Sequence, residues 1–162
     1  MPVLAKLARP RRTIRSGQGV GRALVRADRW VGRRTHGRFV ALGLRDLPSL
    51  LITTTGRKTG LPRTNPLLYA QDGDAFVVIG SNWGQTDHPA WSGNLIAHPD
   101  AVVTLRGEDI PVRARLTSGA EKERLRGLLE AIWPAYRLYV QRAAGRDIRI
   151  FRLERRHTDS AE

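Results

Sequence analysis

From residue 48 onward, short apolar runs alternate with turn residues, which is the pattern of a β-rich domain. Gly- and Asp-containing turns such as Asp72-Gly73-Asp74 separate several of these runs, so we expect antiparallel hairpins. Pro62 and Pro66 restrict the start of the second strand to a sheet edge or a bulge. The run at 75–81 is apolar enough to be buried on both faces. The predicted strands are residues 50–55, 65–70, 75–81, 101–106, 110–116 and 147–153.

Helices are predicted at three places in the same region. Thr86 or Asp87 would cap the first, which carries Pro89 in its first turn and ends near residue 97. Ser118 followed by Glu121 is typical of a capping box, and it predicts a helix through about residue 132. A third, short helix begins at residue 134. The pattern therefore predicts an α+β, mainly β fold, a small six-stranded antiparallel barrel with flanking helices.

Charge divides the chain into parts. Residues 1–46 have a net charge of +10, whereas residues 47–162 have a net charge of +3. Residues 20–35 could form an amphipathic basic helix. We expect a basic segment at 1–46 that is partly disordered or helical, a barrel domain at 47–156 and a tail at 157–162. The segment is open to three interpretations: a solvated tail, a contact with an anionic membrane surface, or a contact with nucleic acid, which no recognition motif supports.

Composition excludes several kinds of chemistry. The chain has no cysteine, so disulfides and thiolate nucleophiles are excluded. Its four histidines lie far apart in the sequence, and we expect no metal site. No apolar run reaches the ~20 residues that span a bilayer, and no apolar region follows Arg11-Arg12, so we expect a cytoplasmic protein. No Ser-His-Asp order or carboxylate pair suggests hydrolysis.

Three groups of residues could carry chemistry. The first is a hairpin tip whose cations, hydroxyl and backbone donors could bind a phosphate, although a solvated tip has the same composition. The second is the loop at 80–84, where small and polar residues could let a flat ring approach, although it could be an ordinary connection. The third is a set of aromatics that form either a core stripe or a cavity wall with phenolic donors. The residues are Arg57, Lys58, Thr59 and Arg63; Ser81, Asn82, Trp83 and Gly84; and Trp133, Tyr136 and Tyr139.

Two further residues, Trp91 and Asn94, lie three apart on one predicted helix face. We expect Trp91 to be in the core and Asn94 to brace a neighbouring loop. Together with the three groups above, they predict a pocket with an anion-binding rim, a slot for a planar ring and phenolic donors. Such a pocket suits a phosphorylated ring cofactor better than a macromolecular partner.

An ordered set of motifs over residues 38–154 resembles the deazaflavin-dependent nitroreductase family. These proteins are split β-barrel oxidoreductases that use the 8-hydroxy-5-deazaflavin coenzyme F-420. The resemblance implies an FMN-binding-like split barrel. The motifs are Thr53-Thr54-Thr55-Gly56-Arg57-Lys58-Thr59-Gly60 with Asn65-Pro66, then Gly80-Ser81 with Gly84, then Pro89-Ala90-Trp91 and Asn94-Leu95-Ile96-Ala97-His98-Pro99.

The resemblance also implies roles for individual residues. Arg57 and Lys58 would hold the phosphate and acidic tail of the coenzyme, and its ring would lie against the loop at 80–84. Tyr136 would stabilise negative charge on the reduced acceptor. Ser81 and Tyr139 are the next catalytic candidates, and the remaining expected cofactor contacts are Thr59, Arg63, Asn65, Asn82, Trp83, Gly84 and Trp91.

Two departures from the family pattern concern the acceptor side. Asn82 stands where a lysine is frequent, and Trp83 stands where a small residue is usual. A bulky indole at this position would narrow or reshape the space for the acceptor.

We therefore predict an oxidoreductase that passes a hydride from reduced coenzyme F-420 to a small planar acceptor such as a quinone, enone or nitroaromatic compound. The alternatives are an FMN- or haem-binding split barrel and a non-catalytic deazaflavin carrier. The expected partners are a small-molecule acceptor, an anionic membrane surface at the inner face that residues 1–46 contact, and a second copy of the chain. No nucleic acid is expected.

Overall fold

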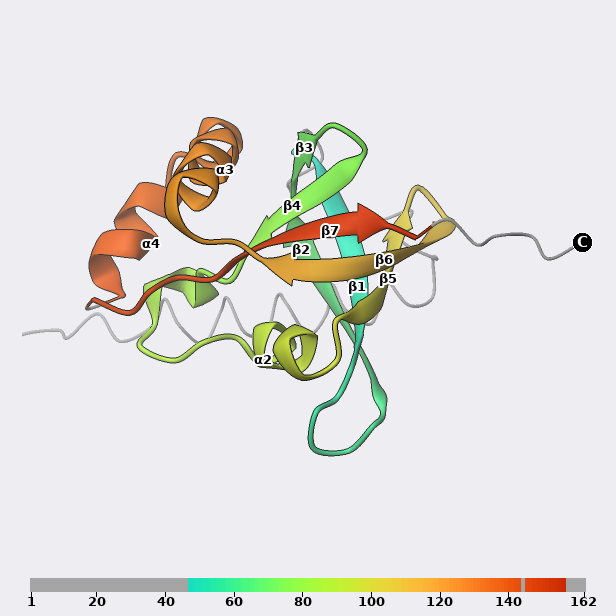
Figure 1. Cartoon of the computed structure of the whole chain (residues 1–162). Helices are drawn as coiled ribbons and strands as arrows, with labels where there is room; N and C mark the ends of the chain where they lie inside the picture. Colours follow the sequence, from blue (N-terminus) through green and yellow to red (C-terminus); the bar gives the residue numbers. More distant parts are fainter. Residues whose placement is uncertain (1–46, 144, 157–162) are drawn as a thin grey trace, which may run out of the picture.

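The structure, a computed structural model, describes residues 47–143 and 145–156. The basic segment expected at 1–46, with its helix at 20–35, and the tail at 157–162 lie outside the described residues. Within the described part, a curled antiparallel sheet of seven strands forms the body of the molecule, and helices α3 and α4 pack at one end of it (Figure 1). The fold is therefore mainly β with flanking helices, as expected.

The order of elements follows the sequence prediction closely. The strands and helices are β1 (Ser49–Thr55), β2 (Pro62–Leu68), β3 (Ala70–Asp72), β4 (Ala75–Ile79), η1 (Asn82–Gly84), α2 (Ala90–Ala97), β5 (Asp100–Leu105), β6 (Glu108–Leu116), α3 (Gly119–Ile132), α4 (Tyr136–Arg142) and β7 (Ile150–Arg155). No helix in these residues is long and apolar enough to cross a bilayer.

The sheet curls because one continuous stretch of chain joins its two edges. The strand order is β2-β1-β5-β6-β7-β4-β3, so β2 and β3 lie at opposite ends of the order. They are separated in sequence by Tyr69 alone, whose N–H donates to the carbonyl of Pro48 at 3.0 Å. The prediction of six strands was wrong by one, because the predicted strand at 65–70 divides at Tyr69 and its two halves pair with different neighbours. Edge placement of Pro62 and Pro66 is confirmed, since both lie in β2.

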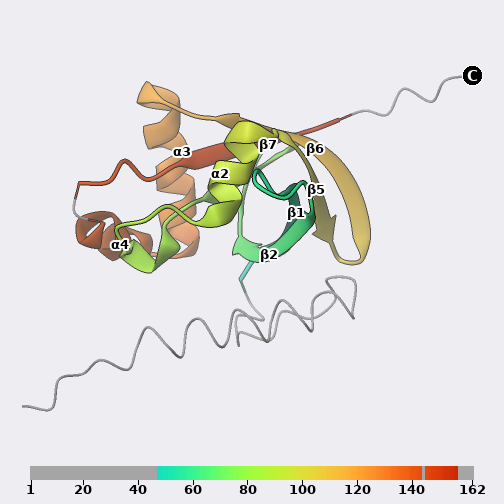
Figure 2. The same cartoon turned by 90° about the horizontal axis from the view of Figure 1, so that it is seen from below.

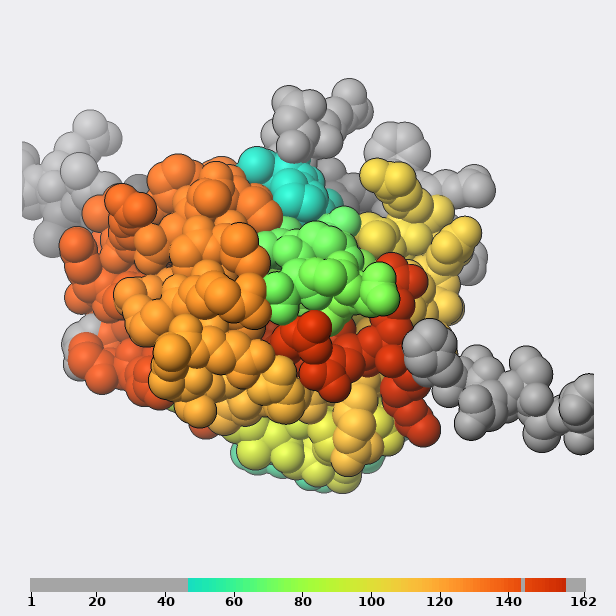
Figure 3. Space-filling model, turned by 45° about the horizontal axis from the view of Figure 1, so that its top comes forward, coloured from blue at the N-terminus to red at the C-terminus, as the bar shows by residue number. Residues whose placement is uncertain are grey.

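Strand β4 separates two hydrophobic cores. Its five residues are all buried, as the sequence predicted. Side chains alternate along a strand, so Phe76 and Val78 join the core inside the barrel, and Val77 and Ile79 join the core beneath α3 and α4. Figure 3 shows α3, in orange, covering this side of the molecule beside the green strands. The helical layer thus has a core of its own, and strand β4 contributes to both cores.

Helix α3 begins where expected, but its predicted capping box does not form. Ser118 occupies the N-cap position and makes no side-chain capping hydrogen bond. The Glu121 carboxylate instead accepts two hydrogen bonds from the guanidinium of Arg115 on β6, both at 2.8 Å. A bidentate Arg–carboxylate pair is stronger than a bond to a backbone N–H, and this pairing is visible only in the folded chain.

Candidate functional site

One cavity brings most of the predicted site residues together. It has a volume of about 840 Å³ and lies between the β1–β2 hairpin, the loop after β4, and helices α2 and α4. Figure 2 views this end of the molecule, with α2 between α4 and strands β1 and β2. The predicted residues that line the cavity are Arg57, Lys58, Thr59, Arg63, Asn65, Ser81, Asn82, Trp83, Trp91, Asn94, Trp133, Tyr136 and Tyr139.

The hairpin tip is a tight turn that carries cations to the edge of this cavity. The N–H of Gly60 donates to the carbonyl of Gly56 at 2.7 Å, and the N–H of Gly56 donates to the carbonyl of Leu61 at 2.9 Å. Gly60 has φ +68°, which favours glycine because it has no Cβ. The turn leaves Arg57 and Lys58 exposed. Their charged groups are therefore accessible to an anion that approaches the edge of the cavity.

Asn94 fixes this tip to helix α2. Its side chain is 5% exposed; the Oδ1 atom accepts the N–H of Arg57 at 3.1 Å, and the Nδ2 atom donates to Thr54 Oγ1 at 3.1 Å. The predicted bracing role is confirmed. Trp91 is in the core as predicted, with its ring 5.9 Å from that of Phe151, and it also lines the cavity.

The rim is positively charged. Arg57, Lys58 and Arg63 make no ion pair with any carboxylate in residues 47–143 or 145–156. Asp87 is the one carboxylate among the described residues that line the cavity. Free cations around a concave site attract anionic ligands and can give them charge-assisted hydrogen bonds.

The loop after β4 takes a left-handed turn at η1. Asn82, Trp83 and Gly84 have φ values of +47°, +57° and +73°. This conformation is unfavourable by roughly 1–2 kcal/mol for a residue that has a Cβ. The turn leaves Trp83 47% exposed at the cavity, with its ring 6.0 Å from that of Tyr139.

Gly84 does not line the cavity. A Cβ at this position would lie 2.8 Å from the Cβ of Arg142 and 3.1 Å from the backbone of Tyr139. Its structural role is therefore close packing of the loop on α4, and the expected contact with the ring remains a prediction.

Tyr136 and Ser81 are the buried hydroxyl groups of the cavity. Tyr136 is 6% exposed and Ser81 is 9% exposed, and neither hydroxyl forms a hydrogen bond with a described residue. Burial raises the pKa of Tyr136 above its ordinary value, so the phenol stays protonated and can donate. A buried donor without a partner is unfavourable by about 1–3 kcal/mol, so the hydroxyl of Tyr136 is available to donate a hydrogen bond to a group in the cavity.

The aromatic wall comes from two helices. Trp133 is the C-cap residue of α3, whereas Tyr136 and Tyr139 belong to α4, so the three do not share one helix face as expected. They still line the same cavity, because the chain turns between the helices. The rings of Tyr136 and Tyr139 lie 6.1 Å apart in an edge-to-face arrangement.

Two polar residues at the loop after β4, His88 and Arg146, were not among the predicted site residues. His88 lines the cavity, and its Nδ1 atom lies 3.0 Å from Arg146 Nη1. Burial and the charges of Arg149 and Arg146 lower the pKa of His88. The two residues are 58 positions apart in the sequence, and no local spacing connects them.

Fold and site together define a split β-barrel protein with a cavity that has a cationic rim and an aromatic wall. The chain belongs to the F420H(2)-dependent quinone reductase family, whose model matches residues 24–155.

Individual relatives agree with this assignment. The F420H(2)-dependent quinone reductase Rv1261c of Mycobacterium tuberculosis is 40% identical over 96 residues, which cover 59% of this chain and 64% of the relative. The chain thus spans less than two thirds of the length of this relative.

Two solved structures share the fold. An F420-H2 dependent reductase, FDR-A, is 31% identical with a TM-score of 0.61, over 66% of this chain and 94% of that chain. A second structure, described as a domain-swapped dimer, is 29% identical with a TM-score of 0.63, over 77% and 97% of the two chains.

Proposed function

We propose that this protein is an oxidoreductase that uses reduced coenzyme F-420 to reduce a small planar acceptor. One observation carries the proposal: among the described residues, cations without a carboxylate partner and a buried tyrosine hydroxyl without a hydrogen-bond partner line the same cavity. The names of the relatives support the same chemistry, because they describe F420H(2)-dependent reductases.

The residues present fit the coenzyme. Its ribityl phosphate and acidic tail need cationic and N–H donors, which Arg57, Lys58 and Arg63 can supply with Thr59 and Asn65 beside them. Its flat ring needs a slot, which the loop at 80–84 and Trp91 can supply. A volume of about 840 Å³ is in the range of about 300–1,000 Å³ that is common for ligand pockets.

The chain's own residues would orient and stabilise the reacting groups. When bound in its reduced form, coenzyme F-420 supplies a hydride. Tyr136 would donate a hydrogen bond to the acceptor oxygen on which negative charge develops, because its raised pKa keeps the phenol protonated. Ser81 would donate a second bond at this site, and Tyr139 would hold the ring of Tyr136 in place. Solvent would supply the proton that completes the reduction.

Aromatic side chains favour a planar acceptor. Trp83, Tyr139 and Trp133 give the cavity apolar walls that suit quinones, enones or nitroaromatic compounds. Quinones are the first choice, because the transferred charge then resides on an oxygen that a phenol can hydrogen-bond. The indole of Trp83 is 47% exposed at the cavity; it would narrow the acceptor side and so select small acceptors.

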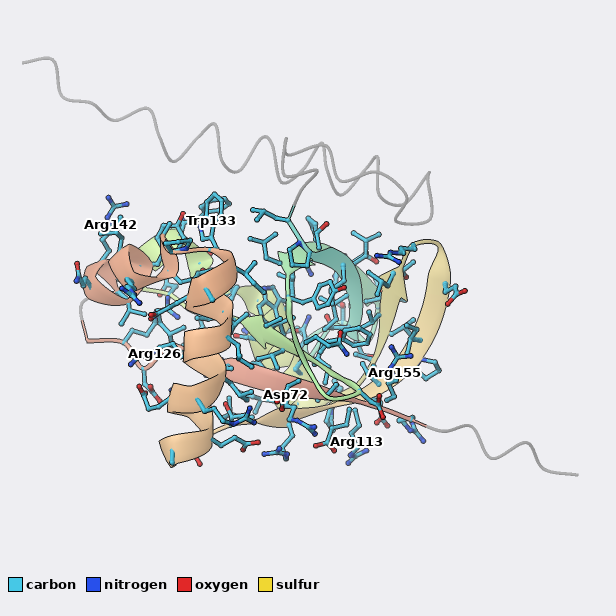
Figure 4. The ribbon with its side chains drawn as sticks, turned by 90° about the horizontal axis from the view of Figure 1, so that it is seen from above. Asp72, Arg113, Arg126, Trp133, Arg142 and Arg155 are labelled. Carbon is cyan, nitrogen blue, oxygen red and sulfur yellow. The ribbon has the colours of Figure 1, made fainter. Side chains whose placement is uncertain are left out.

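Fluorescence titration of oxidised coenzyme F-420 tests the cofactor assignment. We expect Arg57→Ala/Lys58→Ala to weaken binding by at least about tenfold, since two charge-assisted contacts are lost. Arg113→Ala/Arg126→Ala removes two charges from positions outside the cavity and serves as the control (both are labelled in Figure 4). Equal affinities in both double variants would overturn the proposal. Parallel titrations with FMN and haem test the alternative cofactors.

A steady-state assay tests the enzymatic part. Reduced coenzyme is mixed with a quinone, an enone or a nitroaromatic compound, and its reoxidation is followed. We expect the quinone to be reduced fastest, and Tyr136→Phe to slow the reaction more than it weakens coenzyme binding. Coenzyme binding without reduction of any acceptor would favour a non-catalytic carrier.

Two finer proposals concern partners. We propose that the chain divides into a basic segment at 1–46, a barrel domain at 47–156 and a tail at 157–162, and that the basic segment contacts anionic lipid. Salt-sensitive binding to anionic vesicles should disappear when residues 1–46 are deleted. We also propose a homodimer, which light scattering in solution tests; a structural neighbour is described as a domain-swapped dimer.

A further inference from the structure

We propose that Arg146 is the positioning residue for the ring side of the cavity. Its guanidinium holds the loop at 80–88 in the conformation that the coenzyme meets. The inference rests on the proposed function, because it assigns to this loop the contact with the deazaflavin ring.

The guanidinium is bonded to both ends of the loop. Its Nη1 and Nη2 atoms donate to the carbonyls of Gly80 and Ser81 at 3.1 and 2.8 Å, at the start of the loop. The Nε atom donates to the carbonyl of Gln85 at 3.1 Å, beyond the left-handed turn, and Nη1 also lies 3.0 Å from His88 Nδ1. The fork geometry of one side chain therefore connects four points of the loop.

This loop needs such support. It contributes six residues to the cavity lining: Ser81, Asn82, Trp83, Gln85, Asp87 and His88. Its turn is left-handed at two residues that have a Cβ, and such a conformation persists only when the surroundings enforce it. The bonds from Gly84 N–H to Ser81 and from Asn82 Nδ2 to Asp87 lie within the loop and cannot anchor it to the barrel.

His88 makes the attachment of the loop to Arg146 sensitive to pH. A guanidinium only donates, so His88 Nδ1 must be unprotonated to accept from Arg146. Protonation would place an N–H opposite another N–H and remove this bond. The charged groups that act on His88 are Arg146 and Arg149, which disfavour its charged form, and Asp87 and Asp147, which favour it. Burial and the two arginines outweigh the two aspartates and lower the pKa of His88, so the bond is present above that pKa and is lost as the pH falls through it.

Amide hydrogen exchange, measured on the protein without coenzyme, directly tests whether Arg146 holds the loop in place. We expect Arg146→Gln to speed exchange of the Gly84 and Gln85 amides by at least about tenfold, because the loop then opens locally. Arg149→Gln is the matched control: it removes the same charge, and its side chain bonds Ser92 Oγ instead of the loop. Arg146→Lys keeps the charge without the fork, and its exchange should lie between that of the wild type and that of Arg146→Gln.

Coenzyme titration is the second readout. Arg146→Gln should raise the coenzyme Kd by at least about tenfold, and Arg149→Gln should raise it less. The coenzyme affinity of the wild type should fall as the pH falls through the pKa of His88, because the bond to Arg146 is lost. His88→Gln retains an acceptor for Arg146 but cannot titrate, so this pH dependence should disappear in the variant. Equal exchange and equal affinity in Arg146→Gln and Arg149→Gln would overturn the proposal. If exchange is faster in Arg146→Gln but the wild type does not bind the coenzyme, the role of Arg146 in holding the loop stands and the proposed function is rejected.

Discussion

The absence of a side chain at Gly93 allows the guanidinium of Arg57 to lie against helix α2. The guanidinium of Arg57 lies over this glycine of α2 and donates from Nη1 to the carbonyl of Ala90 at 3.1 Å. A Cβ on Gly93 would lie 2.4 Å from that Nη1 atom. The side chain is long and exposed, so it would move away while the helix stays intact. The position of the Arg57 guanidinium thus depends on a glycine for which no sequence pattern indicates a role.

We therefore expect Gly93→Ala to separate binding from stability. Alanine in a helix is favoured over glycine by about 0.5–1 kcal/mol, so the urea midpoint should not fall. Coenzyme binding should weaken several-fold, because Arg57 leaves its place. Gly127→Ala, in α3 with open space around its Cβ, is the matched control and should stabilise the fold without changing the affinity. Wild-type affinity in Gly93→Ala would contradict the placement of Arg57.

At the scale of elements, the contact between η1 and α4 joins the ring slot to the tyrosine wall. Gly84 makes this contact possible, since a Cβ would collide with Arg142 and with the backbone of Tyr139. The loop carries Ser81 and Trp83, and the helix carries Tyr136 and Tyr139. The close packing of Gly84 on α4 thus fixes both sides of the predicted reaction site relative to each other.

Alanine substitution at two left-handed glycines measures this contact. Gly84→Ala and Gly73→Ala both place a Cβ at positive φ, +73° and +59°, but open space surrounds Gly73. We expect Gly73→Ala to destabilise the fold by about 1 kcal/mol from backbone strain alone. Gly84→Ala should destabilise by about 2–4 kcal/mol, as steric overlap adds to the strain. Equal urea midpoints for the two variants would show that the loop and α4 are not in close contact.

Sequence patterns predicted those elements whose formation depends on residues close together in the sequence. A continuous apolar run predicted β4 and its burial on two faces, and Ser118 marked the start of α3. The start of α2 was predicted too early, because its N-cap is Pro89 and not Thr86 or Asp87. The position of Arg57, Lys58 and Thr59 together at the edge of the cavity could be predicted too, because these residues are consecutive in one turn. What could not be predicted depends on distant partners: the division of the second strand at Tyr69, the pairing of Glu121 with Arg115, and the hold of Arg146 on the loop.

At the scale of the molecule, Asp72 ties the helical layer to the sheet. Its carboxylate at the end of β3 accepts from Arg124 of α3 at 2.8 Å and from Arg152 of β7 at 3.0 Å. These bonds hold the pKa of Asp72 down at about 2. Figure 4 shows Asp72 well away from Trp133 and Arg142, so a change here tests stability separately from the site.

We expect Asp72→Asn to lower stability at neutral pH. Because the folded-state pKa lies below the ordinary 3.8, the contribution of Asp72 is fully present above about pH 4 and is lost as the pH falls to about 2. The urea midpoint of the variant should therefore be lower at pH 7 and should change less between pH 4 and pH 2. Asp100→Asn breaks the exposed pairs with Arg113 and Arg156 and should have little effect. A wild-type pH dependence in Asp72→Asn would rule out this role.

The proposed function depends most on where the coenzyme binds. A crystal structure of the protein with coenzyme F-420 tests this directly. We predict the phosphate at hydrogen-bond distance, about 3 Å, from Arg57 or Lys58. The ring should lie against Ser81 and Asn82, with the Tyr136 hydroxyl facing the space beside it. A ring outside this cavity, or a phosphate away from the β1–β2 tip, would contradict the account.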